Sequence, residues 1–193
     1  MIHATQAASA GRTLIQLVEL SELETESRAL LTPEHSPREF LQVLIEKERF
    51  ADAVRLLAHA LPRREGVWWA WVCARRVAGE MPAPKVKAVL DATELWIREP
   101  TDDHRRAAMQ RAEEAEFGTA AGCAGLAAFL SGDNLAPANA STPVPPGEFM
   151  AAKAITGSVM IAAVATEPEK ATEKFQAFIQ QGLDVANRVK LWP

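Results

Sequence analysis

Several side chains that can act as acids, bases or metal ligands are grouped along the chain. His59 lies among leucine and alanine in LAHAL, and Asp91 and Glu94 are three residues apart. An imidazole and two carboxylates would supply acid–base catalysis if they met in one pocket. The simpler interpretation is favoured for each. A lone histidine on an apolar face is more often a core residue than a base. Asp91 pairs with Lys87, four residues before it, as on a solvated helix face.

Two further polar groups stand where helices are expected to begin or end. Asp102-Asp103-His104 has residue types that bind metals, but acidic side chains are also favoured in the first turn of a helix that Thr101 would cap. Ser131-Gly132-Asp133-Asn134 is typical of a helix-ending turn, although its exposed backbone could hold a ligand. The chain has no G-x-S-x-G, phosphate-loop, H-E-x-x-H or calcium-loop motif. We therefore predict no catalytic residues, no metal site, no cofactor and no enzymatic activity.

The two cysteines, Cys73 and Cys123, each lie in an apolar helical context. No CxxC motif or Cys/His cluster indicates zinc. We predict two buried thiols, as in a protein of a reducing compartment.

Three of the five tryptophans fall within VWWAWVC, residues 67–73. On a helix, Trp68 and Trp71 share one face, whereas Trp69 points about 100° away. Packing between two other helices explains this pattern best, but tryptophan and arginine are also enriched where partner proteins bind. We expect Trp68 or Trp69 to be partly exposed. The candidate partner-binding residues are Trp68, Trp69, Arg63, Arg64, Arg75 and Arg76.

The composition favours helices. Apolar residues make up 48% of the chain, alanine is abundant and tyrosine is absent. Ser36-Pro37-Arg38-Glu39 has the pattern of a capping box that begins a helix, and Gly79 ends the helix that contains the tryptophans. We predict an all-α fold of about eight or nine antiparallel helices, arranged as stacked helical hairpins or an irregular bundle.

The predicted organisation has two parts. Residues 1–20 form a flexible N-terminal arm, in which residues 13–20, TLIQLVEL, are the only plausible strand and could equally be extended. Residues 21–193 form a single helical domain, with a short helix at 21–31 and a proline-rich crossing loop at 132–147.

Charge and hydropathy exclude two classes of partner. The net charge is −4, and residues 63–111, although mildly basic, lack a stripe of basic and aromatic side chains that would bind nucleic acid. The most apolar stretch, residues 149–165, is short for a membrane span and contains Lys153, so we predict a buried helix without membrane insertion. No secretory signal opens the chain, and we expect a cytoplasmic protein.

Four stretches carry a resemblance that extends over residues 32–188. They are SPREFLQVLIEKERFADAVRLLAHALPRREGVWWAWVCAR, ELWIREPTDDHRRAAMQRAE, LAAFLSGDNLAP and VPPGEFMAAKAITGSVMIAAVA. Together they resemble a family of uncharacterised bacterial all-helical proteins that is associated with type VI secretion gene neighbourhoods. It implies an accessory, adaptor or chaperone of a secretion apparatus, and it carries no catalytic residues with it.

The sequence thus predicts a non-enzymatic helical module that binds another protein. One alternative is a small-ligand-binding protein or an enzyme that uses His59, Asp91 and Glu94. Another is an immunity protein that neutralises a toxin. The partner and the oligomeric state stay open.

Overall fold

The computed structural model describes residues 12–137 and 139–192, and within these ranges the chain forms ten α-helices and no β-strand. The predicted all-α fold is confirmed. The helices are α1 (Leu14–Leu20), α2 (Thr25–Arg28), α3 (Pro37–Glu46), α4 (Phe50–Ala60), α5 (Arg63–Ala78), α6 (Pro84–Arg98), α7 (Asp102–Ala115), α8 (Ala120–Leu130), α9 (Met150–Val164) and α10 (Ala171–Arg188), with a 3₁₀ turn at Pro168–Lys170.

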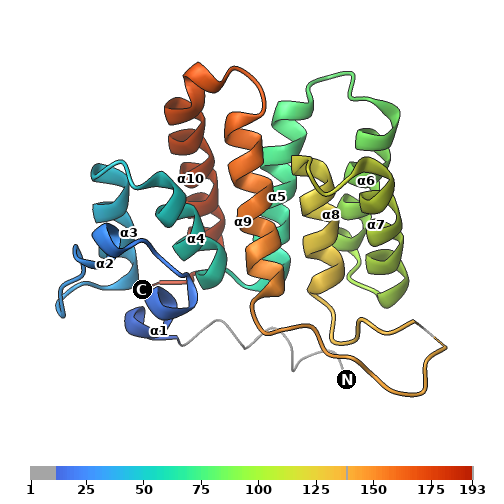
Figure 1. Cartoon of the computed structure of the whole chain (residues 1–193), viewed down its shortest axis with the longest axis horizontal. Helices are drawn as coiled ribbons and strands as arrows, with labels where there is room; N and C mark the ends of the chain where they lie inside the picture. Colours follow the sequence, from blue (N-terminus) through green and yellow to red (C-terminus); the bar gives the residue numbers. More distant parts are fainter. Residues whose placement is uncertain (1–11, 138, 193) are drawn as a thin grey trace.

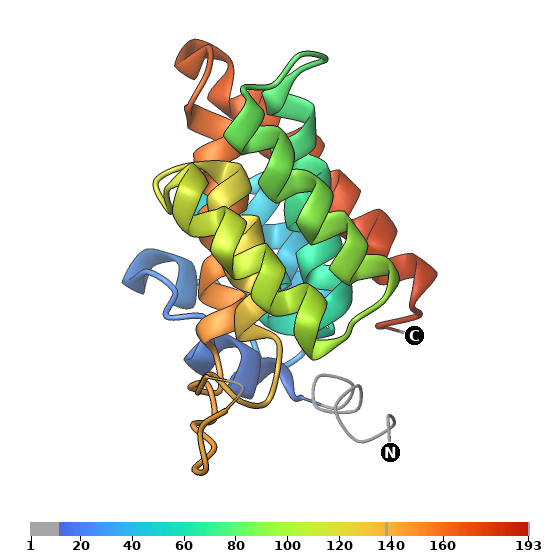
Figure 2. The same cartoon turned by 90° about the vertical axis from the view of Figure 1, so that its right-hand side faces the viewer.

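Helices α5 to α10 run alternately up and down (Figure 1). Helix α5 packs against α6 and α8 on one side and against α9 and α10 on the other, and α4 joins the second group through α9 and α10. Figure 2 shows α6 and α7 as the outer pair on one side of the molecule. Helix α7 packs against α6 and α8, and α8 also packs extensively against α9, so the two groups meet along α8 and α9 as well as at α5.

The capping residues predicted from the sequence begin and end the helices as expected. Ser36 Oγ accepts a hydrogen bond from the Glu39 amide, and the Glu39 carboxylate accepts one of 2.8 Å from the Ser36 amide. Gly79 follows the last residue of α5 with a φ of 73°, a value at which a side chain would be strained. These local signals set where the helices begin and end.

The N-terminal prediction is wrong where the structure describes that segment. Residues 14–20 form a helix, begun by a capping box between Thr13 and Gln16, and not a strand or extended arm. Leu14, Leu17 and Val18 have helical spacing and are buried, and α1 packs against α4. The helix predicted at residues 21–31 is shorter, since α2 covers only Thr25–Arg28. Residues 1–11 of the predicted arm lie outside the described residues.

The apolar stretch at 149–165 forms α9, which buries Ala151, Ile155 and Val159, so the predicted buried helix is confirmed. Among the described residues, no single helix is long and apolar enough to cross a membrane; α9 and the segment after it pass that test only together, across a bend of 114°. The proline-rich segment crosses from α8 to α9 without a helix in residues 132–137 and 139–147 (Figure 1).

Candidate functional site

The tryptophans of α5 have three different environments. Trp69 is fully buried, and its Nε1 donates a 2.7 Å hydrogen bond to the Phe178 carbonyl of α10. Trp71 is half-buried and donates to the Leu90 carbonyl of α6 at 2.9 Å. Trp68 is partly exposed, with the Arg188 guanidinium carbon 5.3 Å from its ring centroid. The expectation that Trp68 or Trp69 is partly exposed is therefore confirmed by Trp68, whereas the Trp69 ring belongs to the core.

Trp68 belongs to a stripe of half-buried and exposed side chains that runs along α5. Arg64, Trp68, Val72 and Arg75 are spaced by three or four residues, and we call this stripe the Trp68 face. Arg64 connects it to α6, because its Nε donates to the Ile97 carbonyl at 2.7 Å. Arg188 of α10 borders it on the other side. The Trp68 face therefore runs between α6 and α10.

The remaining predicted site residues lie elsewhere. Arg63 reaches the end of α8, where it donates to the Ser131 carbonyl at 3.4 Å and lies 3.8 Å from the Asp133 carboxylate. Arg76 lies over the Phe178 ring, with its guanidinium carbon 5.8 Å from the centroid. Of the six candidate residues, the structure gathers only Arg64, Trp68 and Arg75 on one face.

The alternative acid–base constellation is not assembled. His59 is buried on α4 beside Phe149, with the two ring centroids 5.7 Å apart. Asp91 and Glu94 lie on α6, each in an ion pair of 2.5 Å, with Lys87 and Arg98 respectively. Figure 1 places α4 and α6 on opposite sides of α5 and α9. The three groups that this hypothesis needs in one pocket are therefore dispersed.

The acidic group at the start of α7 is engaged in local contacts. The Asp102 carboxylate accepts a 2.6 Å hydrogen bond from Arg106 and pairs with Arg105. Within the part of the chain that the structure describes, no three His, Cys, Asp or Glu side chains are grouped so as to hold a metal ion. Cys73 and Cys123 are buried free thiols, as predicted.

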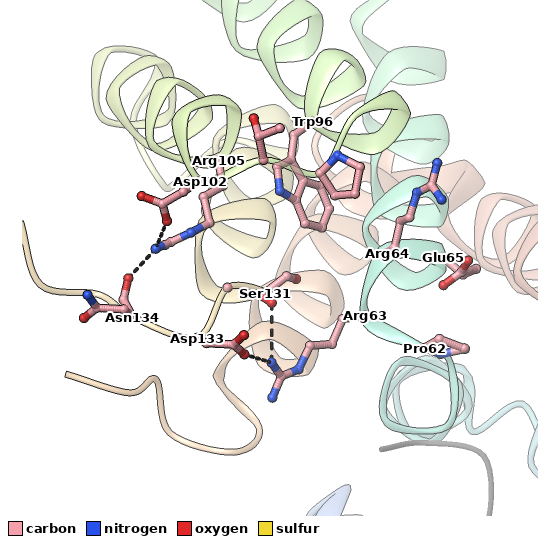
Figure 3. Close-up of a pocket in the computed structure, with 13 residues that line it drawn as sticks. Pro62, Arg63, Arg64, Glu65, Trp96, Asp102, Arg105, Ser131, Asp133 and Asn134 are labelled. Carbon is pink, nitrogen blue, oxygen red and sulfur yellow. Dashed lines mark hydrogen bonds and ion pairs between the residues drawn. The ribbon is translucent and has the colours of Figure 1, made fainter. Parts of the chain in front are cut away.

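A pocket that the sequence did not reveal has a volume of about 440 Å³. It lies where the start of α5, the end of α6, the start of α7 and the end of α8 meet (Figure 3). The Arg105 side chain is only 4% exposed. It joins α7 to the end of α8 by donating hydrogen bonds to the Phe129 carbonyl, at 3.1 Å, and to the Asn134 carbonyl. One signal was present: Arg105 continues the buried stripe of Ala108, Ala112 and Ala115.

The chain belongs to a family of unknown function, DUF6931, whose profile matches residues 40–186. This match confirms the resemblance to an uncharacterised family. It covers most of α3, all of α4 to α9 and most of α10, and thus both the Trp68 face and the pocket. Neither a curated protein nor a solved structure matches the chain.

Proposed function

We propose that this protein is a non-enzymatic protein–protein interaction module and that it binds its partner through the Trp68 face. The observation that carries this proposal is the partial exposure of Trp68 on α5, beside the guanidinium of Arg188. Tryptophan and arginine are the side chains most enriched among residues that dominate binding energy. A half-buried indole is already held in place by its own helix, so less conformational entropy is lost when a partner covers it.

The charges on this face and at its border define the partner's chemistry. Arg75 and Arg188 are both exposed, one in the last turn of α5 and the other in the last turn of α10. We propose that the partner presents an apolar side chain to the Trp68 ring and acidic side chains to these arginines. Such complementarity would speed association and orient the partner.

The family resemblance supports a more specific role. We propose that the protein works in the bacterial cytoplasm as an accessory, adaptor or chaperone of a type VI secretion system. The three candidate groups of the enzymatic alternative lie apart, His59 on α4 and Asp91 and Glu94 on α6, so we favour the interaction module over an enzyme that uses these residues.

The test is a pull-down of the tagged, full-length protein from its host's lysate, with three variants compared. Trp68→Ala and Arg75→Gln alter the Trp68 face. Arg111→Gln, at an exposed arginine of α7 that pairs with Glu114 at 2.9 Å, is the charge-matched control. We expect one stoichiometric protein to remain bound to the wild type and to Arg111→Gln, and to be lost in Trp68→Ala. Arg75→Gln should weaken retention and make it less sensitive to salt.

Two results would contradict the proposal. A partner held equally by wild type and Trp68→Ala would place the interface elsewhere, and absence of any partner would favour a small ligand. Thermal unfolding of each variant shows whether a loss of binding reflects a loss of fold. A partner that is toxic when expressed alone would instead identify an immunity protein.

A further inference from the structure

Helix α1 lies at the edge of the helical domain, beside the lower end of α4 (Figure 1). It has seven residues, and the side chains that it buries are those of Leu14, Leu17 and Val18. It also lies outside residues 40–186, which the family profile matches. An element that buries few apolar side chains opens locally at a lower free-energy cost than the whole domain. We therefore expect α1 to be able to detach while the later helices stay folded.

A contact at each end holds α1 to the rest of the protein. Before α1, Arg12 donates a 3.1 Å hydrogen bond to the His59 carbonyl, and its guanidinium carbon lies 5.7 Å from the centroid of the Phe149 ring. After α1, the Glu22 carboxylate accepts a 2.8 Å hydrogen bond from Lys153 of α9. We call the segment from Arg12 to Glu22 the α1 clasp. Each end of the clasp brings a charge close enough to act on the same side chain, His59.

His59 is buried in a setting that suits only its neutral form. The residue is 4% exposed, and its ring packs beside Phe149. Its Nδ1 is buried, and no described residue forms a hydrogen bond with this atom. A protonated imidazole carries an N–H on both ring nitrogens, so the Nδ1–H would be left in the interior without an acceptor. A buried donor without an acceptor is costly, and a charged one more so.

The charges around His59 also oppose its protonation. Arg12 and Lys153 lie close enough to repel a further positive charge, and Glu22, which would attract it, is already paired with Lys153. Glu148 is 3.7 Å from Arg12 but is 68% exposed. Helices α3 and α10 also pack against α4, and among the described residues neither brings a charged group that acts on the imidazole. The closed clasp therefore disfavours the imidazolium.

We propose that the α1 clasp is a pH-sensitive element that opens when His59 takes up a proton. Detachment of Arg12 removes a positive charge and lets water hydrate the imidazolium. With a pKa near 6.5 in the open state and about 4 in the closed state, the ratio of open to closed protein rises by about twentyfold between pH 7 and pH 5. Opening exposes the apolar side chains of α1, so acid uncovers an apolar surface that is covered at neutral pH. This device does not depend on the Trp68 face.

The test is hydrogen–deuterium exchange of the full-length protein between pH 7 and pH 5, followed by mass spectrometry of peptides from α1 and α8. Each measured rate is divided by the intrinsic exchange rate at the same pH, so that only the opening of structure remains. We expect the opening constant of α1 to rise about twentyfold from pH 7 to pH 5. At pH 5 the α8 peptide should still be protected at least about a hundredfold more strongly than α1. Equal protection of the two would show that α1 detaches only when the whole domain unfolds, and would overturn the proposal.

Variants show which group titrates. His59→Gln cannot take up a proton, so the opening of its α1 should change less than about twofold over the same pH range, and His59→Leu offers the same test without a polar group to bury. Glu22→Gln breaks the contact with Lys153 and should open α1 more at every pH, but the rise of about twentyfold should remain. His35→Gln, at a histidine that packs beside Phe40, should match the wild type. An unchanged rise in both His59 variants, or loss of the rise in Glu22→Gln or His35→Gln, would show that His59 is not the group that opens the clasp.

Discussion

The Trp69 indole lies directly against the backbone of Gly182, so that a methyl group on Gly182 would come within 2.8 Å of the ring atom Cε2. The same ring donates its 2.7 Å hydrogen bond to Phe178, one turn earlier on α10. Helices α5 and α10 are thus joined by a close approach and a buried hydrogen bond. This arrangement requires that residue 182 has no side chain.

Gly182→Ala should therefore destabilise the protein, because the new methyl group would also lie 2.5 Å from Leu57 Cδ2. We expect the free energy of unfolding to fall by about 1–3 kcal/mol. Gly157→Ala is the control, since a methyl group there meets only Cys123 Sγ, at 3.5 Å, and should stabilise α9 by up to about 1 kcal/mol. Urea unfolding followed by circular dichroism measures both. Equal stability of the two variants would mean that α10 does not approach Trp69 so closely.

The sequence predicts those features of the fold that depend only on residues close together in the chain. Capping residues such as Ser36 and Thr101 act within one turn, so helix starts follow from the sequence directly. The environment of Trp69 depends on α10, more than a hundred residues later, and no local pattern shows which side of α5 that helix covers. The prediction for the segment TLIQLVEL is wrong for the same reason. Its apolar residues fit a strand or a helix, and burial against α4 favours the helix.

Arg105 fixes the start of the segment that crosses from α8 to α9. We expect Arg105→Met to lower the free energy of unfolding by about 2–3 kcal/mol, because the partly buried Phe129 carbonyl loses its donor and the Asn134 carbonyl keeps only the long contact of 3.5 Å to Arg106. The amides of Ala136 and Val144, which donate to Asn134 Oδ1, should then exchange faster with deuterium. Arg111→Met removes only an exposed pair and should cost at most about 1 kcal/mol. Unchanged exchange at Ala136 and Val144 in Arg105→Met would show that Arg105 does not anchor the crossing.

The pocket was beyond sequence reasoning for a geometric reason. Its residues come from four helix ends between Pro62 and Asn134, and only the alternating directions of α5 to α8 bring these ends together. Each polar residue had a local explanation in the sequence, as a cap, a turn or a solvated charge. The sequence indicates a possible ligand site at the turn of residues 131–134, but it does not show that Trp96 lines the same pocket or that Arg63 contacts Ser131 and Asp133 of this turn.

The two thiols should be unreactive in the folded protein. Burial raises the pKa of the Cys73 thiol and also that of Cys123, whose Sγ donates to the Phe117 carbonyl at 3.0 Å. Because the thiolate is the reactive form, we expect neither cysteine to react with a disulfide reagent such as DTNB at pH 8 faster than the protein unfolds. In denaturing urea both should react at once. Rapid reaction of one thiol under native conditions would show that its helix opens locally.

His59 should make the stability of the protein depend on pH. Burial, together with the nearby charges of Arg12 and Lys153, lowers the pKa of His59 to about 4, from an ordinary value of 6.5. Its Nδ1 is buried, and no described residue forms a hydrogen bond with it. As the pH falls below 6.5, the unfolded chain takes up a proton at this residue before the folded protein does. Stability is therefore complete above pH 6.5 and is lost between pH 6.5 and 4, by about 3 kcal/mol in total.

The measurement is urea unfolding between pH 6.5 and 5, a range above the one in which the lowered pKa values of Glu22 and Glu39 contribute. Over this range we expect the wild type to lose about 2 kcal/mol of its free energy of unfolding. His59→Gln has no group that titrates at this position, so its stability should change much less over the same range, even if the variant is less stable throughout. Equal slopes in the two proteins would contradict the prediction and show that water or a polar group reaches the His59 ring in the folded state.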